Sequence, residues 1–169
     1  QCLLYGPPGT GKTASAMCIA NQLEKPFIEL SITDFKKKYV GEGAGNFDKA
    51  MTAIYKSEIC KKYGGSVLFI DEVDDILSGT GDITNIFLTW TNNDGPPRAK
   101  INLSLLQFRP HILLATNKIN VIKDNVKDRF NSKVFYGLPK NPTIRGQIFF
   151  NALSKQVKDS SLPSDNSIL

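Results

Sequence analysis

The sequence predicts a three-layer α/β/α sandwich built on a parallel sheet. Short apolar runs rich in β-formers alternate with stretches whose apolar residues recur at helical spacing. The continuous apolar run at residues 67–70 is typical of a strand that helices cover on both faces. Polar residues follow several of these runs directly, and in parallel sheets ligands bind beyond the carboxyl ends of the strands. The pattern therefore predicts a fold class and the edge of the sheet where a site should lie.

Turn and breaker residues divide the chain into alternating elements. Strands are expected at residues 3–5, 27–30, 67–70, 111–116 and 134–136. Helices are expected at residues 13–25, 45–63, 83–90, 124–130 and 143–157. Pro26 ends the first helix and the Gly64-Gly65 pair closes the second, because proline cannot continue a helix and glycine favours the turn that follows one. This alternation is typical of βαβ units and therefore of parallel strands.

Size and composition narrow the class of the protein. The chain has 169 residues, of which 41% are hydrophobic and 22% charged, so it can bury a proper core as one domain and shows no long disorder. A net charge of +5 permits contact with nucleic acid or an acidic surface without requiring it. No apolar run is long enough to span a bilayer, and no signal peptide is present. We expect a piece of a longer intracellular protein, located in the cytoplasm, whose targeting region lies outside this sequence.

The three cysteines carry little functional signal. Cys2, Cys18 and Cys60 are odd in number, and their spacing matches no metal site. We expect all three to be reduced packing residues, as is usual in an intracellular protein.

Residues 6–13 read GPPGTGKT and follow the Walker A pattern G-x-x-x-x-G-K-[ST]. The pattern lies between an apolar run and a helical stretch, which is the context of a phosphate-binding loop. Glycine lets successive N–H groups point at one concave spot, and the following helix adds its positive end. Lys12 can reach the β- and γ-phosphates, and the Thr13 hydroxyl can ligate Mg²⁺. The residues expected to bind the nucleotide are Gly6, Pro7, Pro8, Gly9, Thr10, Gly11, Lys12, Thr13 and Ala14.

Phosphoryl transfer to water also needs a metal, a positioned water and a positive charge. Asp71 directly follows an apolar strand and is expected to hold Mg²⁺ together with Thr13. Glu72, one residue on, can polarise the attacking water. Asn117 ends the next apolar strand, and its uncharged amide can bond the γ-phosphate or the water. Arg129 is the candidate for the positive charge. We therefore expect Glu72, Lys12, Asn117 and Arg129 to be catalytic.

These motifs resemble the AAA family of P-loop ATPases. The stretch VLFIDEVD at residues 67–74 and LLATN at residues 113–117 follow the Walker A loop in the family's order. The resemblance implies a parallel five-stranded sheet, in which the strand before Asn117 lies between the strands that carry Walker A and Asp71. It also implies a nucleotide-binding core at residues 1–139 and the beginning of a helical lid at residues 140–169.

The resemblance further implies ATP and Mg²⁺ as cofactors and a shared active site. Lys12 and Thr13 would act on phosphates and Mg²⁺, Asp71 on Mg²⁺, Glu72 on water and Asn117 as sensor 1. Arg129 matches the arginine that family members supply to the neighbouring subunit, which implies a homo- or hetero-oligomeric ring, normally a hexamer.

Residues 39–43, YVGEG, resemble the first pore loop of the protein-translocating members. The resemblance implies that Tyr39 and Val40 project into the central channel of the ring. An aromatic and a β-branched side chain on a glycine-flanked loop can grip an extended polypeptide with little sequence preference. Protein substrates are therefore the expected partners.

The leading interpretation is an ATPase that remodels, unfolds or disassembles protein substrates through a ring pore. A clamp-loader or helicase-loader ATPase linked to nucleic acid is the second interpretation; the net charge supports it and the pore-loop pattern speaks against it. A non-hydrolysing nucleotide-binding scaffold is the third. It is motivated by Arg129, which stands alone where many family members carry two arginines, and the intact Lys12, Asp71 and Glu72 speak against it.

Overall fold

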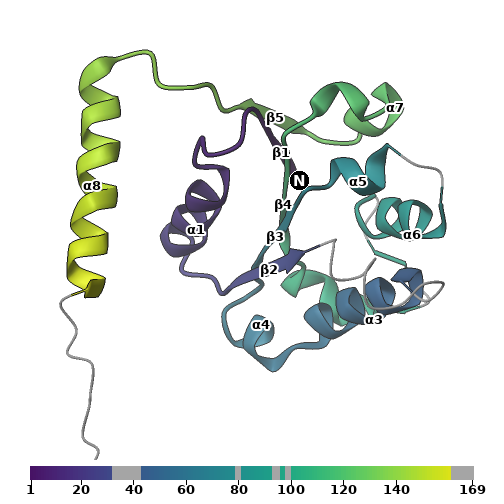
Figure 1. Cartoon of the computed structure of the whole chain (residues 1–169). Coiled ribbons are helices and arrows are strands. Elements are labelled where there is room, and N and C mark those ends of the chain that lie inside the picture. The colour runs from purple at the N-terminus through teal and green to yellow at the C-terminus, as the bar shows by residue number, and fades with distance from the viewer. Residues whose placement is uncertain (32–42, 79–80, 93–95, 98–99, 161–169) are drawn as a thin grey trace, which may run out of the picture. The chain divides into compact units, whose positions relative to one another are not determined.

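The computed structural model describes residues 1–31, 43–78, 81–92, 96–97 and 100–160 (Figure 1). The chain divides into two compact units, one from Gln1 to Tyr136 and one that begins at Gly137. The first unit holds the sheet, and the described part of the second is dominated by α8 (Pro142–Ser160). The division at residue 139 into a core and a lid stays a prediction.

The described residues form one sheet of five parallel strands in the order β2-β3-β4-β1-β5. The strands are β1 (Cys2–Tyr5), β2 (Phe27–Ser31), β3 (Val67–Asp71), β4 (His111–Thr116) and β5 (Ser132–Phe135). The expected position of β4 between β1 and β3 is confirmed. Because the strands are parallel, the residues that follow β1, β3 and β4 meet at the same edge of the sheet.

Helices cover both faces of this sheet, with α1 on one face and α3, α5 and α6 on the other (Figure 1). The described α-helices of this unit are α1 (Lys12–Gln22), α3 (Gly43–Lys56), α4 (Glu58–Lys62), α5 (Asp74–Leu77), α6 (Asp82–Trp90) and α7 (Asp124–Lys127). Two short 3₁₀ helices, η1 (Leu103–Phe108) and η2 (Ile119–Val121), flank β4.

Two apolar clusters, one on each face, hold the layers together. Successive strand residues point to opposite faces, so Leu4 packs in the cluster that contains Ala16 of α1, whereas Leu3 packs in the cluster that contains Phe47 of α3 and Trp90 of α6. The same alternation along β3 and β4 buries both faces of these strands. The three-layer sandwich is therefore confirmed.

The single helix expected at residues 45–63 is in fact two helices, α3 and α4. Ser57 has an extended backbone, with φ −62° and ψ 128°, and its side chain accepts a hydrogen bond from the Cys60 N–H. Serine at this position caps a new helix more favourably than it continues the old one. After the break Ile59 faces outward, where 59% of its surface is exposed.

Other expectations need smaller corrections. The first helix ends at Gln22, three residues earlier than expected, and Glu24 takes a left-handed backbone with φ 53°. Cys60 is buried and Cys2 is half-buried, but Cys18 is exposed, so the prediction that Cys18 packs in the core was wrong. Among the described helices, including α8, none combines the length and the apolar character that crossing a membrane requires.

Candidate nucleotide-binding site

The loop between β1 and α1 depends on glycine at its first position. Gly6 has φ 145°, and a Cβ there would lie 2.1 Å from the carbonyl oxygen of Tyr136. The Gly6 N–H also donates to the carbonyl of Thr116 at 3.3 Å, which ties the loop to the end of β4. A side chain would therefore push the loop away from Tyr136, which directly follows β5.

The rest of the loop turns tightly into α1. Gly9 and Gly11 have positive φ angles of 73° and 92°, a left-handed backbone that glycine adopts without strain. The Thr10 hydroxyl donates to the Pro7 carbonyl at 2.8 Å and closes the turn. The helix then begins at Lys12, so its free N–H groups face the space in front of the loop.

Lys12 is buried, with 6% of its surface exposed, and its ammonium group has three acceptors. The Nζ atom donates to the carbonyls of Gly6 and Pro7, each at 2.9 Å, and to Oδ1 of Asn117 at 2.8 Å. Burial lowers the pKa of Lys12, and the negative charge of Asp71 partly opposes this effect. The Lys12 amino group therefore contacts its own loop and Asn117 after β4, and it feels the charge of Asp71 at the end of β3.

Asp71 and Glu72 leave β3 in different directions. Asp71 is the last residue of the strand, and its Oδ1 accepts the backbone N–H of Glu72 at 2.8 Å. Glu72 has φ 54°, a left-handed conformation that is costly for a residue with a side chain. Its side chain is exposed. Asp71 lines the pocket in front of the loop, and Glu72 does not.

That pocket has a volume of about 380 Å³ and is lined by residues 8–14, Asp71 and Asn117. The structure thus brings together Lys12, Thr13, Asp71 and Asn117, which come from three separate motifs. Gly6 and Pro7 do not line the pocket, but their carbonyls accept from Lys12. These carbonyl contacts leave no signal in the sequence, because any residue type could supply them.

The donors in this pocket fit Mg²⁺ better than a metal that needs a protein cage. The hydroxyls of Thr10 and Thr13 and one carboxylate, on Asp71, line it, and the Thr10 hydroxyl already donates to the Pro7 carbonyl. Mg²⁺ commonly keeps several waters and takes one or two protein oxygens together with phosphate oxygens. Throughout the described residues, no group of three or more His, Cys, Asp or Glu side chains could hold a metal ion.

The geometry of this pocket does not test two of the predicted functions. Arg129 follows α7, is half-buried and does not line the pocket. Tyr39 and Val40 lie outside the described residues. Their roles therefore stay predictions.

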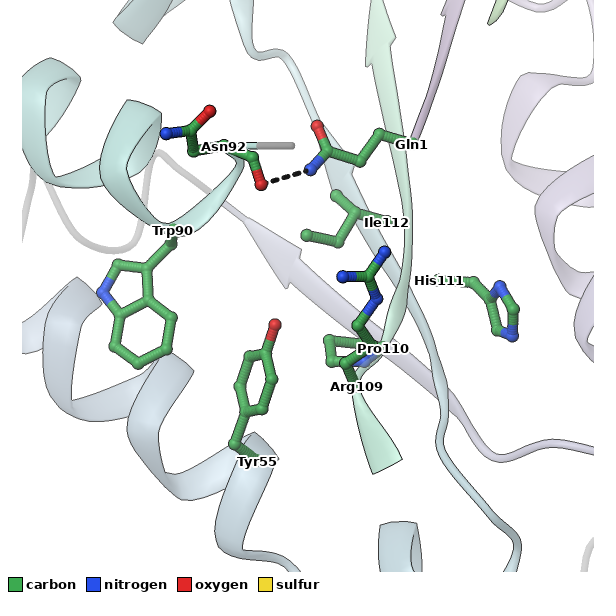
Figure 2. A pocket seen from close by; sticks show the side chains of 8 residues that line it. All are labelled: Gln1, Tyr55, Trp90, Asn92, Arg109, Pro110, His111 and Ile112. Atoms are coloured by element: carbon green, nitrogen blue, oxygen red, sulfur yellow. Dashed lines mark hydrogen bonds between the residues drawn. The ribbon is translucent and has the colours of Figure 1, made fainter. Parts of the chain in front are cut away.

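A second, more enclosed pocket of about 140 Å³ lies at the opposite edge of the sheet, next to the first residues of β4. In Figure 2, the side chains of Tyr55 and Arg109 reach into it, and the Gln1 amide donates to the Asn92 carbonyl at 3.5 Å. The side chain of His111 points away from the others (Figure 2). No phosphate-binding loop or carboxylate lines this pocket, so its chemistry differs from that of the first one.

Comparison with known proteins identifies the family. Residues 2–138 match the family described as "ATPase family associated with various cellular activities (AAA)". The chain belongs to the AAA family. The expected resemblance is confirmed, and with it the assignment of the sheet as the AAA type of P-loop fold.

Fidgetin-like protein 1 of Homo sapiens is 33% identical over 162 residues, which cover 91% of this chain and 22% of the human protein. Spastin of Xenopus laevis is 32% identical over 163 residues, covering 91% of this chain and 24% of spastin. A crystal structure of the FIGL-1 AAA domain in complex with ADP superposes with a TM-score of 0.69 at 31% identity, covering 91% of this chain and 48% of that one. The chain thus spans only about a quarter of the length of these two full-length relatives.

Proposed function

We propose that this chain binds ATP with Mg²⁺ and hydrolyses it. The observation that carries the proposal is the pocket in which Lys12, Thr13, Asp71 and Asn117 converge in front of a helix N-terminus. The similarity to an AAA domain that binds ADP supports an adenine nucleotide as the ligand.

The contacts of Lys12 indicate how a phosphate would enter. An ammonium group has three donors, and all three are used, on Gly6, Pro7 and Asn117. The two carbonyls are fixed by the loop, whereas the Asn117 side chain can rotate. A γ-phosphate is therefore expected to replace Asn117 on Lys12, which frees the amide to orient the attacking water. Mg²⁺ would supply charge neutralisation on the phosphates from the side of Thr13 and Asp71.

Glu72 is the residue we assign to proton transfer. Its carboxylate is exposed directly after the strand that ends at Asp71, and it can accept a proton from water. In the full-length protein, Glu72→Gln is expected to lower turnover about 10²–10⁴-fold, because an amide cannot take the proton. Binding of ATP should remain.

The test measures ADP release and, separately, the affinity for a fluorescent ATP analogue. Glu24→Gln is a matched control, because Glu24 has nearly the same backbone, with φ 53° against 54° at Glu72, but lies at the end of α1. Equal turnover in Glu72→Gln and the parent would remove Glu72 from the reaction.

We also propose that the full-length protein assembles into a ring that remodels proteins, with Arg129 completing the site of the neighbouring subunit. Membership of the AAA family and the similarity to fidgetin-like protein 1 and spastin support this proposal. Tyr39 and Val40 would contact the polypeptide in the channel.

A mixing experiment tests the shared site. Arg129→Ala and Glu72→Gln should each be inactive alone. When they are mixed, a subunit with intact Glu72 can receive Arg129 from a neighbour, so activity should reappear. Two inactive variants that stay inactive in every mixing ratio, although they co-assemble, would place Arg129 outside a shared site.

A further inference from the structure

Thr116, the last residue of β4, connects three parts of the nucleotide-binding site. Its backbone carbonyl accepts the Gly6 N–H at 3.3 Å. Its hydroxyl donates to Oδ1 of Asp74 at 2.9 Å and accepts the backbone N–H of Lys118 at 2.9 Å. Asn117 lies in sequence between Thr116 and Lys118, which the second of these bonds connects. The bonds of Thr116 therefore determine the direction in which Asn117 leaves the strand.

Both partners in this contact are buried. Thr116 has 0% and Asp74 has 8% of its surface exposed. Burying a carboxylate costs free energy unless hydrogen bonds compensate it. Asp74 begins α5, and the neighbouring Val73 N–H donates to the Ala115 carbonyl at 3.1 Å, so α5 is fixed to β4 at two adjacent points.

The contact does not serve the core alone. A valine at position 116 would fill the same volume without a buried polar group, and a leucine or alanine at position 74 would avoid a buried charge. The polar pair instead fixes the chain on both sides of Asn117, whose Oδ1 lies 2.8 Å from the Lys12 ammonium.

We propose that Asp74 and Thr116 are positioning residues that hold Asn117 toward Lys12 and the phosphates. The Thr116 hydroxyl donates to Asp74 and accepts from Lys118, and this fixes the backbone at Asn117. The inference rests on the proposed ATPase function and adds to it two residues that do not themselves contact the nucleotide pocket.

The test uses substitutions at Thr116 in the full-length protein. Thr116→Val removes the hydroxyl and keeps the shape, and is expected to lower kcat about 10–100-fold, the usual loss when a supporting hydrogen bond of a site is removed. The affinity for the ATP analogue should change little. Thr116→Ser restores the hydroxyl and should recover most of the rate.

Two further variants separate positioning from stability. Thr91 is also buried, at 0% exposed, and its hydroxyl donates to the Phe87 carbonyl at 2.9 Å, at the end of α6. Thr91→Val should therefore leave kcat unchanged. In an Asn117→Ala background, Thr116→Val should have almost no further effect, because the group that it positions is gone. Fully additive losses would overturn the proposal.

A readout without turnover distinguishes this proposal from the proposed function. The side-chain amide ¹⁵N resonance of Asn117 should shift in Thr116→Val and return toward its original position in Thr116→Ser. A parent that releases no ADP would contradict the ATPase function alone. An Asn117 resonance that is unmoved in Thr116→Val would contradict the positioning role, whatever the ATPase result.

Discussion

The two edges of the sheet carry pockets of different construction. At the carboxyl edge, a pocket of about 380 Å³ is formed by the loop after β1, by Asp71 at the end of β3 and by Asn117 directly after β4. At the amino edge, a pocket of about 140 Å³ is formed by side chains from distant segments, among them Tyr55 of α3 and Trp90 of α6 (Figure 2). The first pocket depends on strand ends and glycines, whereas the second depends on how helices pack.

The charges that surround the basic groups at the two edges also differ. Burial is the main cause that lowers the pKa of both Lys12 and His111. At Lys12 the negative charge of Asp71 opposes this effect, whereas at His111 the positive charges of Lys25 and Arg109 add to it. A cation beside a carboxylate suits a site for Mg²⁺ and phosphate. We therefore expect substitutions at the carboxyl edge to change activity and those at the amino edge to change stability.

The largest effect is expected for Lys12→Met. The substitution removes the ammonium group from the phosphates and should lower kcat about 10²–10³-fold or more. Lys25→Met is the matched control, because Lys25 also donates to two backbone carbonyls, those of Tyr63 and Gly64, at 3.2 and 2.8 Å. ADP release by both variants checks the prediction. An equal loss of activity in the two variants would show that Lys12 has no special role in the reaction.

At the amino edge, Tyr55→Ala should act on stability. Tyr55 is 2% exposed, and its ring centroid lies 5.5 Å from that of Trp90. Truncating a buried aromatic side chain costs about 3–5 kcal/mol of unfolding free energy. Denaturant unfolding measures this loss, and ADP release per folded molecule should match the parent at low temperature. A selective loss of turnover would mean that the amino edge is coupled to the reaction.

The carboxyl edge is the more predictable of the two, for a physical reason. Its glycines, Lys12 and Asp71 belong to local patterns, and a parallel sheet brings strand ends together regardless of the details of packing. The contact between Lys12 and Asn117 follows from the strand order, which the sequence predicts only through the family resemblance. The carbonyl contacts of Lys12 could not be predicted, because they depend on backbone geometry alone.

The amino-edge pocket could not be predicted from periodicity. Tyr55, Trp90 and Arg109 are far apart in sequence, and no motif joins them. The break at Ser57 was missed for a related reason: apolar spacing continued past it, and a single capping side chain outweighed the pattern. The left-handed backbone of Glu72 was also unpredictable, since glutamate rarely adopts it.

A smaller effect is expected where Glu24 and Glu72 are each replaced by glycine. Both have a left-handed backbone, with φ 53° and 54°. Glycine relieves this strain, and we expect each substitution to raise the unfolding free energy by up to about 1 kcal/mol, after the greater freedom of glycine in the unfolded chain is subtracted. Only Glu72→Gly should abolish hydrolysis. Thermal unfolding and ADP release test the pair; destabilisation by Glu72→Gly would show that its backbone is not strained.

The smallest effect concerns pH. Burial, Lys25 and Arg109 lower the pKa of His111 below its ordinary value of 6.5, so the unfolded chain binds a proton more readily than the folded one. Stability from this group is therefore complete above pH 6.5 and falls as the pH drops below that value. On acidification the melting temperature should fall less in His111→Gln than in the parent. Arg109→Gln should also reduce this fall, because it removes one charge that repels protonated His111. His111 does not line the nucleotide pocket, so nucleotide affinity at pH 6 and pH 7 should be the same in His111→Gln and in the parent. If His111→Gln lost nucleotide affinity as the pH fell and the parent did not, the two pockets would be energetically coupled, contrary to this prediction.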